Sequence, residues 1–120
     1  MSQQLKTEAN SLTSQIVTFL NDMGHFAWRL NTMGVYDQNA GRYRKNNSIN
    51  GVTDVMCVLN ITGRSLFVEI KVGKDRMKID QEIFRDEVVK RGAIHWVIND
   101  INQFTETYRE FHAKYYTTKN

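Results

Sequence analysis

Residues 51–72 read GVTDVMCVLNITGRSLFVEIKV, and this stretch decides the fold. It contains two apolar runs, Thr53–Ile61 and Ser65–Val72, on either side of a short segment with a glycine. Runs of this length that are rich in valine, isoleucine, leucine and phenylalanine are typical of the two strands of a β-hairpin. Because side chains alternate across a sheet, one side of the hairpin is entirely apolar and carries Val55, Cys57, Leu59, Leu66, Val68 and Ile70.

The other side of the hairpin carries the charged residues. With the turn centred on residues 62–63, Asp54 lies directly opposite Lys71, and Glu69 lies opposite Met56, the next position on the same side. Asp54, Glu69 and Lys71 are then within reach of one another. A turn of four residues keeps this grouping, whereas a turn of three would split it.

Three charged groups at one end of an apolar hairpin need compensation, because their desolvation is costly. A cation would provide it, since the carboxylates of Asp54 and Glu69 and the backbone carbonyl of Ile70 form the oxygen-only ligand set that Mg²⁺ prefers. Such a metal lowers the pKa of bound water and neutralises phosphate charge, and Lys71 would orient the water and stabilise the transition state. The alternative is a structural ion pair between Asp54 and Lys71.

The rest of the chain is predicted from its periodicity. The pattern predicts, in order, a helix over residues 1–23, a strand over 25–31, a loop over 32–51 whose middle could be extended, a helix over 78–91, a strand over 93–98 and a closing helix that starts at residue 99 or 100. Together with the hairpin, the order is α-β-β-β-α-β-α, which is an α/β fold. A loop of this length is expected to be either functional or disordered.

Composition limits the class of protein. The 120 residues suffice for one core, and the hydrophobic fraction of 41% and charged fraction of 24% are those of a globular domain. No apolar stretch is long enough to span a membrane, so we expect a cytoplasmic protein. The net charge of +3 is compatible with a polyanionic partner. Cys57 is expected to be buried, and the three histidines, which lack metal-ligand spacing, are expected to be structural or on the surface.

The chain also resembles a known family. Gly51-Val52-Thr53-Asp54, a hairpin, Glu69-Ile70-Lys71 and a helix opening with Gln81 are similar to the PD-(D/E)xK nucleases, and within them to the VRR-NUC family of stand-alone phage and bacterial domains. The resemblance runs from the first helix to the strand over 93–98, and threonine replaces the proline that often precedes the first aspartate. It implies a single nuclease domain over 1–120 with a restriction-endonuclease-like fold, in which helices flank a central mixed β-sheet. It also implies Mg²⁺ or Mn²⁺ and phosphodiester hydrolysis.

The resemblance adds two residues to the site. Glu8, which lies on the buried stripe of the first helix, matches the place where many of these nucleases carry a further acid near the metal. A helix start that frays and leaves Glu8 at the surface is the alternative. Gln81 matches a catalytic position beside Lys71 and the scissile phosphate, and a purely structural hydrogen bond is its alternative.

Basic residues are expected to bind the nucleic acid backbone, and so to confer little sequence specificity. The predicted contacts are Arg29, Arg42, Tyr43, Arg44, Lys45, Lys74, Arg76 and Lys78. A solvated basic loop is the alternative for residues 42–45.

These inferences predict a Mg²⁺-dependent DNA endonuclease with no organic cofactor, selective for branched DNA in the manner of a Holliday junction resolvase. A homodimer is expected, because two symmetric cuts need two sites. Surplus aromatic surface on the closing helix would form the interface, at Tyr108, Phe111, Tyr115 and Tyr116. A non-catalytic nucleic-acid-binding module with the same fold is the alternative, and an RNA substrate is not excluded by any residue.

Overall fold

The computed structural model describes residues 3–30, 35–44 and 49–115, with only the backbone described at 35–37 and 42–44. Its elements follow the predicted order, with one addition. They are α1 (Gln3–Asp22), β1 (Phe26–Arg29), β2 (Val35–Asp37), β3 (Arg42–Arg44), β4 (Val55–Val58), β5 (Ser65–Ile70), α2 (Ile79–Val89), β6 (Ile94–Ile98) and α3 (Ile101–Tyr115).

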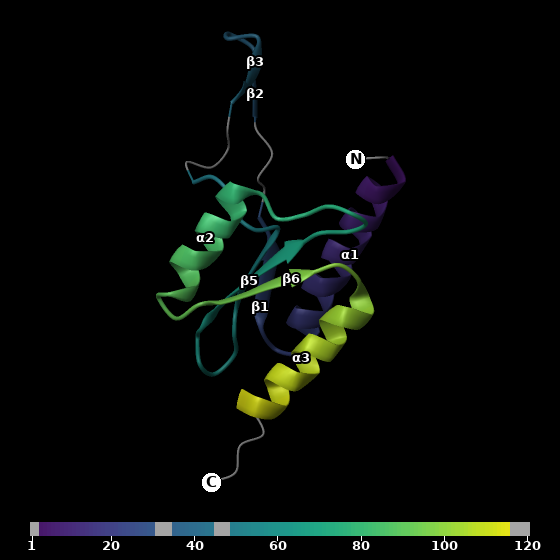
Figure 1. The fold of residues 1–120 in the computed structure, drawn as a ribbon, viewed down its shortest axis with the longest axis vertical. Coiled ribbons are helices and arrows are strands. Elements are labelled where there is room, and N and C mark those ends of the chain that lie inside the picture. Colours follow the sequence, from purple (N-terminus) through teal and green to yellow (C-terminus); the bar gives the residue numbers. More distant parts are fainter. Residues whose placement is uncertain (1–2, 31–34, 45–48, 116–120) are drawn as a thin grey trace.

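The addition is a small hairpin, β2–β3, within the segment predicted as a loop. Val35 pairs with Arg44, Tyr36 with Tyr43 and Asp37 with Arg42. The turn between these short strands includes Gly41, whose φ of 67° lies in the left-handed region that glycine adopts readily. Figure 1 draws this hairpin at the end of the molecule where α2 also begins.

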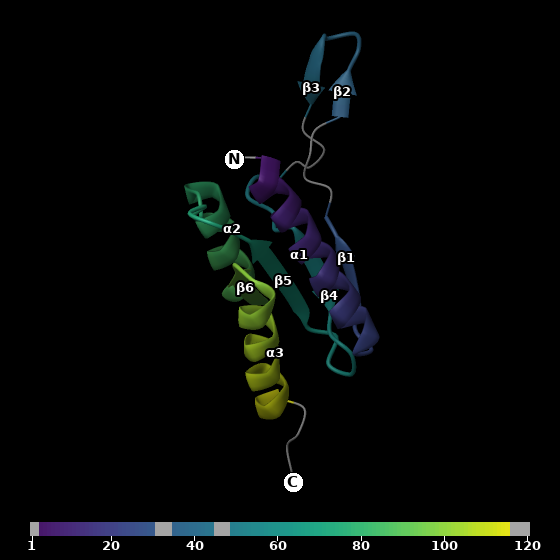
Figure 2. The same ribbon diagram turned by 90° about the vertical axis from the view of Figure 1, so that its right-hand side faces the viewer.

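The central sheet is mixed, as predicted, with the strand order β1-β4-β5-β6. β1 pairs antiparallel with β4, and β4 with β5, whereas β5 and β6 are parallel. The parallel pair requires a crossover, which α2 provides. Figure 1 and Figure 2 show that α2 lies on one face of the sheet and that α1 and α3 lie on the other.

The hairpin β4–β5 has the predicted sides but not the predicted register. Val55 pairs with Val68, and Val58 with Ser65, which is a shift of two residues from the register with a turn centred on 62–63. The turn closes one step earlier than expected, because the N–H of Leu59 donates to the carbonyl of Arg64 at 2.9 Å and leaves a four-residue loop over 60–63. A shift of two residues leaves every side chain on its predicted face.

The core lies between the sheet and the pair α1 and α3. The apolar side of the hairpin is buried there as predicted, with the free thiol of Cys57 in it. α1 contributes Leu12, Ile16 and Leu20, while Phe104 and Tyr108 come from α3. The Phe19 ring lies nearly perpendicular to both rings of α3, with centroids 5.3 Å from Phe104 and 5.0 Å from Tyr108. These close contacts between side chains fix the position of the sheet against the helices.

His25 is structural, within the two alternatives expected for the histidines. Its Nδ1 accepts a hydrogen bond from the backbone N–H of Asn60 at 2.9 Å. Nε2 therefore carries the proton and donates to the Tyr108 hydroxyl, 2.8 Å away. This bond joins the start of β1 to α3. None of the helices in the described part of the chain is long and apolar enough to cross a membrane.

Candidate active site

Asp54 is held where β4 begins. Its backbone carbonyl accepts a hydrogen bond from the N–H of Leu30 at 2.8 Å, which extends the β1–β4 ladder by one step. Its side chain reaches across to β5, where Oδ2 accepts a hydrogen bond from the backbone N–H of Ile70 at 2.8 Å. Asp54 is therefore attached to both neighbouring strands, which fixes its carboxylate at the end of the hairpin.

The observed register changes which charged residues face each other. Continuing the β4–β5 pairing by one residue places Asp54 opposite Glu69, and not opposite Lys71 as predicted. The ammonium of Lys71 lies 3.7 Å from Glu69 Oε2 and 3.7 Å from Asp75 Oδ2. In the described part of the chain Lys71 thus pairs with these two acids, and not with Asp54 as the structural alternative required. The three residues still lie together on one side of the hairpin.

Glu69 lies in an unusual environment for a carboxylate. The residue is only 3% exposed, and its Oε1 is buried without a hydrogen-bond partner among the described residues. Burial, followed by the charge of Asp54, raises the pKa of Glu69 from 4.5 to about 8. Burial also raises the pKa of Asp54, although the N–H of Ile70 and the charge of Lys71 oppose that shift. Two acids with raised pKa values beside one buried lysine are typical of a functional site.

Gln81 contacts Glu69 from the first turn of α2. Its Nε2 donates to Glu69 Oε2 at 3.1 Å, and its Oε1 accepts from the backbone N–H of Lys78 at 2.8 Å. The amide therefore links the start of α2 to the carboxylate. Its nearest partner in the site is Glu69, which it shares with Lys71.

Gly51 brings the segment before Asp54 against the same turn of α2. Its φ is 80°, and a Cβ at this position would lie 2.2 Å from the carbonyl oxygen of Asp80. Only glycine permits so close an approach of two backbones. The spacing of Gly51 three residues before Asp54 thus has a physical reason, because it fixes Asp54 relative to Gln81.

The donor set fits a hard divalent cation. Asp54 and Glu69 provide carboxylate oxygens at one place, and no donor among the described residues reaches Oε1 of Glu69. Oxygen donors of this kind suit Mg²⁺ or Mn²⁺. No cluster of three or more histidine, cysteine or acidic residues that could hold a metal occurs in residues 3–30, 35–44 and 49–115, so these two acids would act with backbone carbonyl and water.

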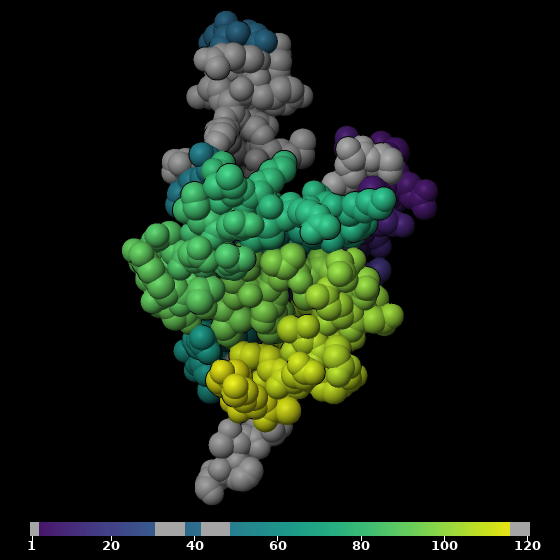
Figure 3. All heavy atoms as spheres, in the orientation of Figure 1, coloured from purple at the N-terminus to yellow at the C-terminus, as the bar shows by residue number. Residues whose placement is uncertain are grey.

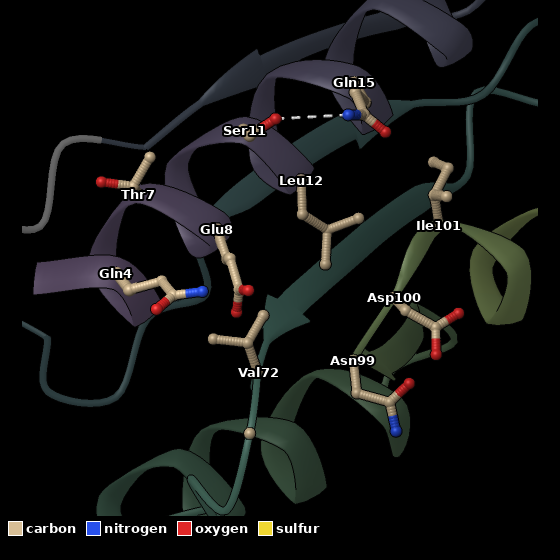
Figure 4. A pocket seen from close by; sticks show the side chains of 11 residues that line it. Gln4, Thr7, Glu8, Ser11, Leu12, Gln15, Val72, Asn99, Asp100 and Ile101 are labelled. Carbon is tan, nitrogen blue, oxygen red and sulfur yellow. Dashed lines mark hydrogen bonds between the residues drawn. The ribbon is translucent and has the colours of Figure 1, made fainter. Parts of the chain in front are cut away.

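Glu8 is exposed, which corrects the expectation that it lies on the buried stripe of α1. The buried positions of this helix are Leu12, Thr13, Ile16 and Leu20, so the stripe begins one turn after Glu8. Glu8 lines a cavity of about 670 Å³ between α1 and the ends of β5 and β6. Figure 4 shows its carboxylate pointing toward Val72, with Asn99 and Asp100 across the cavity. Its role as a metal ligand stays a prediction.

The predicted DNA-binding residues fall into three groups. Lys74, Arg76 and Lys78 are exposed on the connection from β5 to α2, which forms a continuous strip of the surface in Figure 3. Arg29 donates to Asn10 Oδ1 on α1 at 3.0 Å, and its charge opposes the rise in the pKa of Asp54 that burial causes. The segment 42–44 forms β3, but its side chains and Lys45 lie outside the described residues.

Sequence reasoning missed Asp75, whose carboxylate is the second partner of Lys71. The available signal was its position four residues after Lys71 in a short connection, too common a spacing to select it. It also missed the exposed rings of Phe26 and Trp28 on the sheet, because alternation alone does not show which half of a sheet face a helix covers.

Comparison with known proteins identifies the fold. No protein-family model matches the sequence, and no curated protein matches it. A solved structure described as "VRR_NUC domain" matches with a TM-score of 0.60 and 18% sequence identity, over 91% of this chain and 97% of that one. The predicted resemblance is thereby confirmed at the level of architecture, and this chain has the fold of a VRR_NUC domain.

Proposed function

We propose that this chain is a metal-dependent DNA endonuclease that hydrolyses phosphodiester bonds. The observation that carries the proposal is the pairing of a half-buried acid, Asp54, with a buried one, Glu69. Among the described residues one carboxylate oxygen of Glu69 has no hydrogen-bond partner, and the Lys71 ammonium lies 3.7 Å from its other oxygen. The similarity of the fold to a VRR_NUC domain supports the same activity. A non-catalytic binding module has no evident use for two neighbouring acids with raised pKa values.

A Mg²⁺ or Mn²⁺ ion would be held by Asp54, Glu69 and the backbone carbonyl of Ile70. Glu8, which was predicted from the sequence as a further acid, forms no three-acid cluster with them in the described residues. When bound, it would activate water and neutralise charge on the phosphate. It would also compensate the carboxylates of Asp54 and Glu69, whose pKa values are raised by burial. Metal binding therefore requires loss of the Glu69 proton, and affinity should rise with pH.

Side chains of the protein would stabilise the reacting phosphate, position the metal ligands and bind the DNA. Lys71, buried and held between Glu69 and Asp75, provides a fixed positive charge for the phosphate oxygens and the attacking water. Gln81 acts as a positioning residue, because its amide fixes the orientation of the Glu69 carboxylate. Exposed Lys74, Arg76 and Lys78 flank this site and would bind backbone phosphates without reading bases.

Selectivity for branched DNA and a homodimeric state belong to the same proposal. One domain with one site cuts one strand, and a two-fold dimer supplies the two symmetric cuts that a junction requires. The interface on α3 now has less support than its sequence indicated, because Tyr108 is buried in the core and Tyr116 lies outside the described residues. Tyr115 remains half exposed. A site of action in the cytoplasm of a bacterial or phage-infected cell fits this substrate.

The direct test compares Asp54→Ala, Glu69→Ala and Lys71→Ala with the parent on plasmid and branched DNA. Each variant should lose at least about 100-fold in cleavage with Mg²⁺ while retaining DNA binding, because these groups serve the metal and the transition state. Glu106→Ala, which removes an exposed acid from an ion pair on α3, is the matched control and should cleave like the parent. Mn²⁺ should support cleavage and EDTA should abolish it.

Losses below about tenfold in all three variants would show that the site lies elsewhere. Undiminished cleavage in EDTA would exclude metal dependence, and binding without cleavage by the parent under every metal would favour the non-catalytic binding module. Cleavage of RNA but not DNA would change the substrate and leave the site in place.

A further inference from the structure

The sheet face that carries Asp54 is only half covered by a helix. α2 packs over β5 and β6, where the Phe84 ring lies perpendicular to that of Phe67 at a centroid distance of 5.2 Å. On β1 and β4 the same face presents four uncharged side chains, and no helix in the described part of the chain packs over them. These residues are Phe26, Trp28, Met56 and Val58, which we name the open face.

Two aromatic rings dominate the open face. Phe26 is 67% exposed and Trp28 is 37% exposed, although both belong to a strand of the central sheet. Their ring centroids are 5.2 Å apart and the planes are inclined at 44°, so the two rings are in contact and restrict each other's orientation. Exposure of two neighbouring large rings is costly in water, which marks the open face as a binding surface.

The open face adjoins the candidate active site. Trp28 on β1 pairs with Met56 on β4. Asp54 precedes Met56 by two residues, so its side chain lies on the same face of the sheet. The Leu30 to Asp54 hydrogen bond continues the ladder, so Trp28 is the diagonal neighbour of Asp54. Diagonal neighbours in antiparallel strands lie about 7–8 Å apart, within reach of an aromatic side chain. A phosphate at Asp54 would therefore place its adjoining nucleotides over these rings.

We infer that Phe26 and Trp28 form a stacking platform for an unpaired base next to the scissile phosphate. This inference rests on the proposed nuclease function and adds to its substrate, branched DNA, the requirement for an unpaired base beside the cut, as at an opened branch point. A base in a duplex already stacks on its neighbours, whereas an unpaired base offers a free ring face to an aromatic side chain. The absence of charge on the open face suits the base, and the basic connection 74–78 suits the backbone.

A second copy of the chain is the other occupant to consider, and the edge of β1 does not favour it. The outward backbone groups of Ala27 are already occupied, since its N–H donates to Asn21 Oδ1 at 2.9 Å and its carbonyl accepts from Asn21 Nδ2 at 3.0 Å. The side chain of Asn21 therefore occupies the edge of β1 with which a strand of a partner chain would pair. We therefore assign the open face to the nucleic acid.

The test measures binding of two labelled probes to the full chain, with Ca²⁺ in place of Mg²⁺. One probe is an oligothymidylate about 12 nucleotides long and the other is a closed hairpin duplex of similar charge. Trp28→Leu keeps apolar surface but removes the ring, whereas Trp28→Phe keeps a ring. Melting temperature and light scattering check that each variant is folded and has the parent's mass.

Trp28→Leu should weaken oligothymidylate binding by about 5- to 150-fold and change duplex binding by less than about twofold. Trp28→Phe should stay within about threefold of the parent on both probes. Oligothymidylate should also quench parent tryptophan fluorescence, and Trp28→Phe should lose this quenching, because its remaining Trp96 packs against Phe104 and Phe111.

Equal binding of oligothymidylate by Trp28→Leu and the parent would overturn the inference, as would an equal loss on both probes. A fall in mass in Trp28→Leu would assign the open face to contact between copies instead. Because binding is read without cleavage, these results are independent of the nuclease assay, and failure of the parent to cleave any substrate would count against the proposed function alone.

Discussion

Glu69 is the residue whose environment most needs an explanation. The residue is only 3% exposed, and one of its carboxylate oxygens has no hydrogen-bond partner in the part of the chain that the structure describes. Such a carboxylate destabilises the folded protein when it is ionised. Lys71 and Gln81 both contact its other oxygen, Oε2. The remaining oxygen has no partner among the described residues, so the burial of this destabilising carboxylate is explained if that oxygen binds a cation.

The raised pKa of Glu69 predicts how metal-free protein responds to pH. The pKa of Glu69 is about 8 in the folded protein, against an ordinary value of 4.5. The protonated side chain therefore makes its whole contribution to the free energy of unfolding below about pH 4.5, and this contribution is lost as the pH rises toward 8. In EDTA at pH 8, Glu69→Gln should therefore melt at least about 3 °C above the parent, and the difference should vanish at pH 4.5. Differential scanning calorimetry at both pH values measures this.

Metal should reverse the order of the two proteins. Mg²⁺ at pH 8 should raise the melting temperature of the parent and leave Glu69→Gln unchanged, because binding to the folded state alone stabilises it. Glu106→Gln, on the exposed surface of α3, is the control for loss of one charge. A parent that melts above Glu69→Gln in EDTA at pH 8 would contradict the assigned pKa direction.

At the scale of elements, the site depends on the contact between the segment before β4 and the first turn of α2. Gly51 meets the backbone of Asp80, and the next residue, Gln81, holds Glu69. Neither strand alone determines where the amide of Gln81 lies. The close approach of Gly51 to Asp80 therefore sets the position of Asp54 relative to Gln81 on α2.

Gly51→Ala tests this contact, with Gly63→Ala as its matched control. Both glycines have φ between 70° and 85°, but a Cβ at Gly63 meets no atom within 4 Å. Both variants should lose stability from the left-handed backbone, and Gly51→Ala should lose about 1–3 kcal/mol more because Asp80 must move. Urea unfolding measures the difference, and cleavage should fall only in Gly51→Ala. Equal free energies of unfolding would show that the two backbones are not so close.

At the scale of the whole molecule, the helices are distributed unevenly over the sheet. α1 and α3 bury one face, whereas α2 covers the β5–β6 half of the other (Figure 2). The aromatic residues of α3 mostly serve the core, where Tyr108 and Phe104 pack with Phe19. The exposed aromatic rings among the described side chains are Phe26 and Trp28, on the side of the active site, and Tyr115 on α3.

The dimer and its substrate form the prediction at this scale. Light scattering at micromolar concentration should give twice 14.0 kDa, and a four-way junction should be cut faster than a linear duplex of the same sequence, because two sites act on one junction. Tyr115→Ala, which removes the half-exposed ring of α3, should shift the mass toward the monomer if this helix forms the interface. A parent mass of 14.0 kDa excludes the dimer, and equal cleavage rates exclude the preference.

The sequence by itself determined the element order, the two sides of the hairpin and the grouping of Asp54, Glu69 and Lys71, because side-chain alternation is a local property of a strand. The resemblance carried by these residues predicted the fold that the structural similarity confirmed. The register of the hairpin was decided by the tertiary structure, since it depends on which backbone groups close the turn, and Leu59 and Arg64 do so.

The same holds for every contact between distant segments. Asp75 at Lys71, Gln81 at Glu69 and the exposed position of Glu8 depend on where the helices pack, and no local pattern encodes this. The open face beside Asp54 exists because α2, as the crossover between β5 and β6, packs over that half of the sheet and not over β1. The periodicity of the sequence predicts on which side of a helix or strand a residue lies. Only tertiary packing determines which other segment lies against that side.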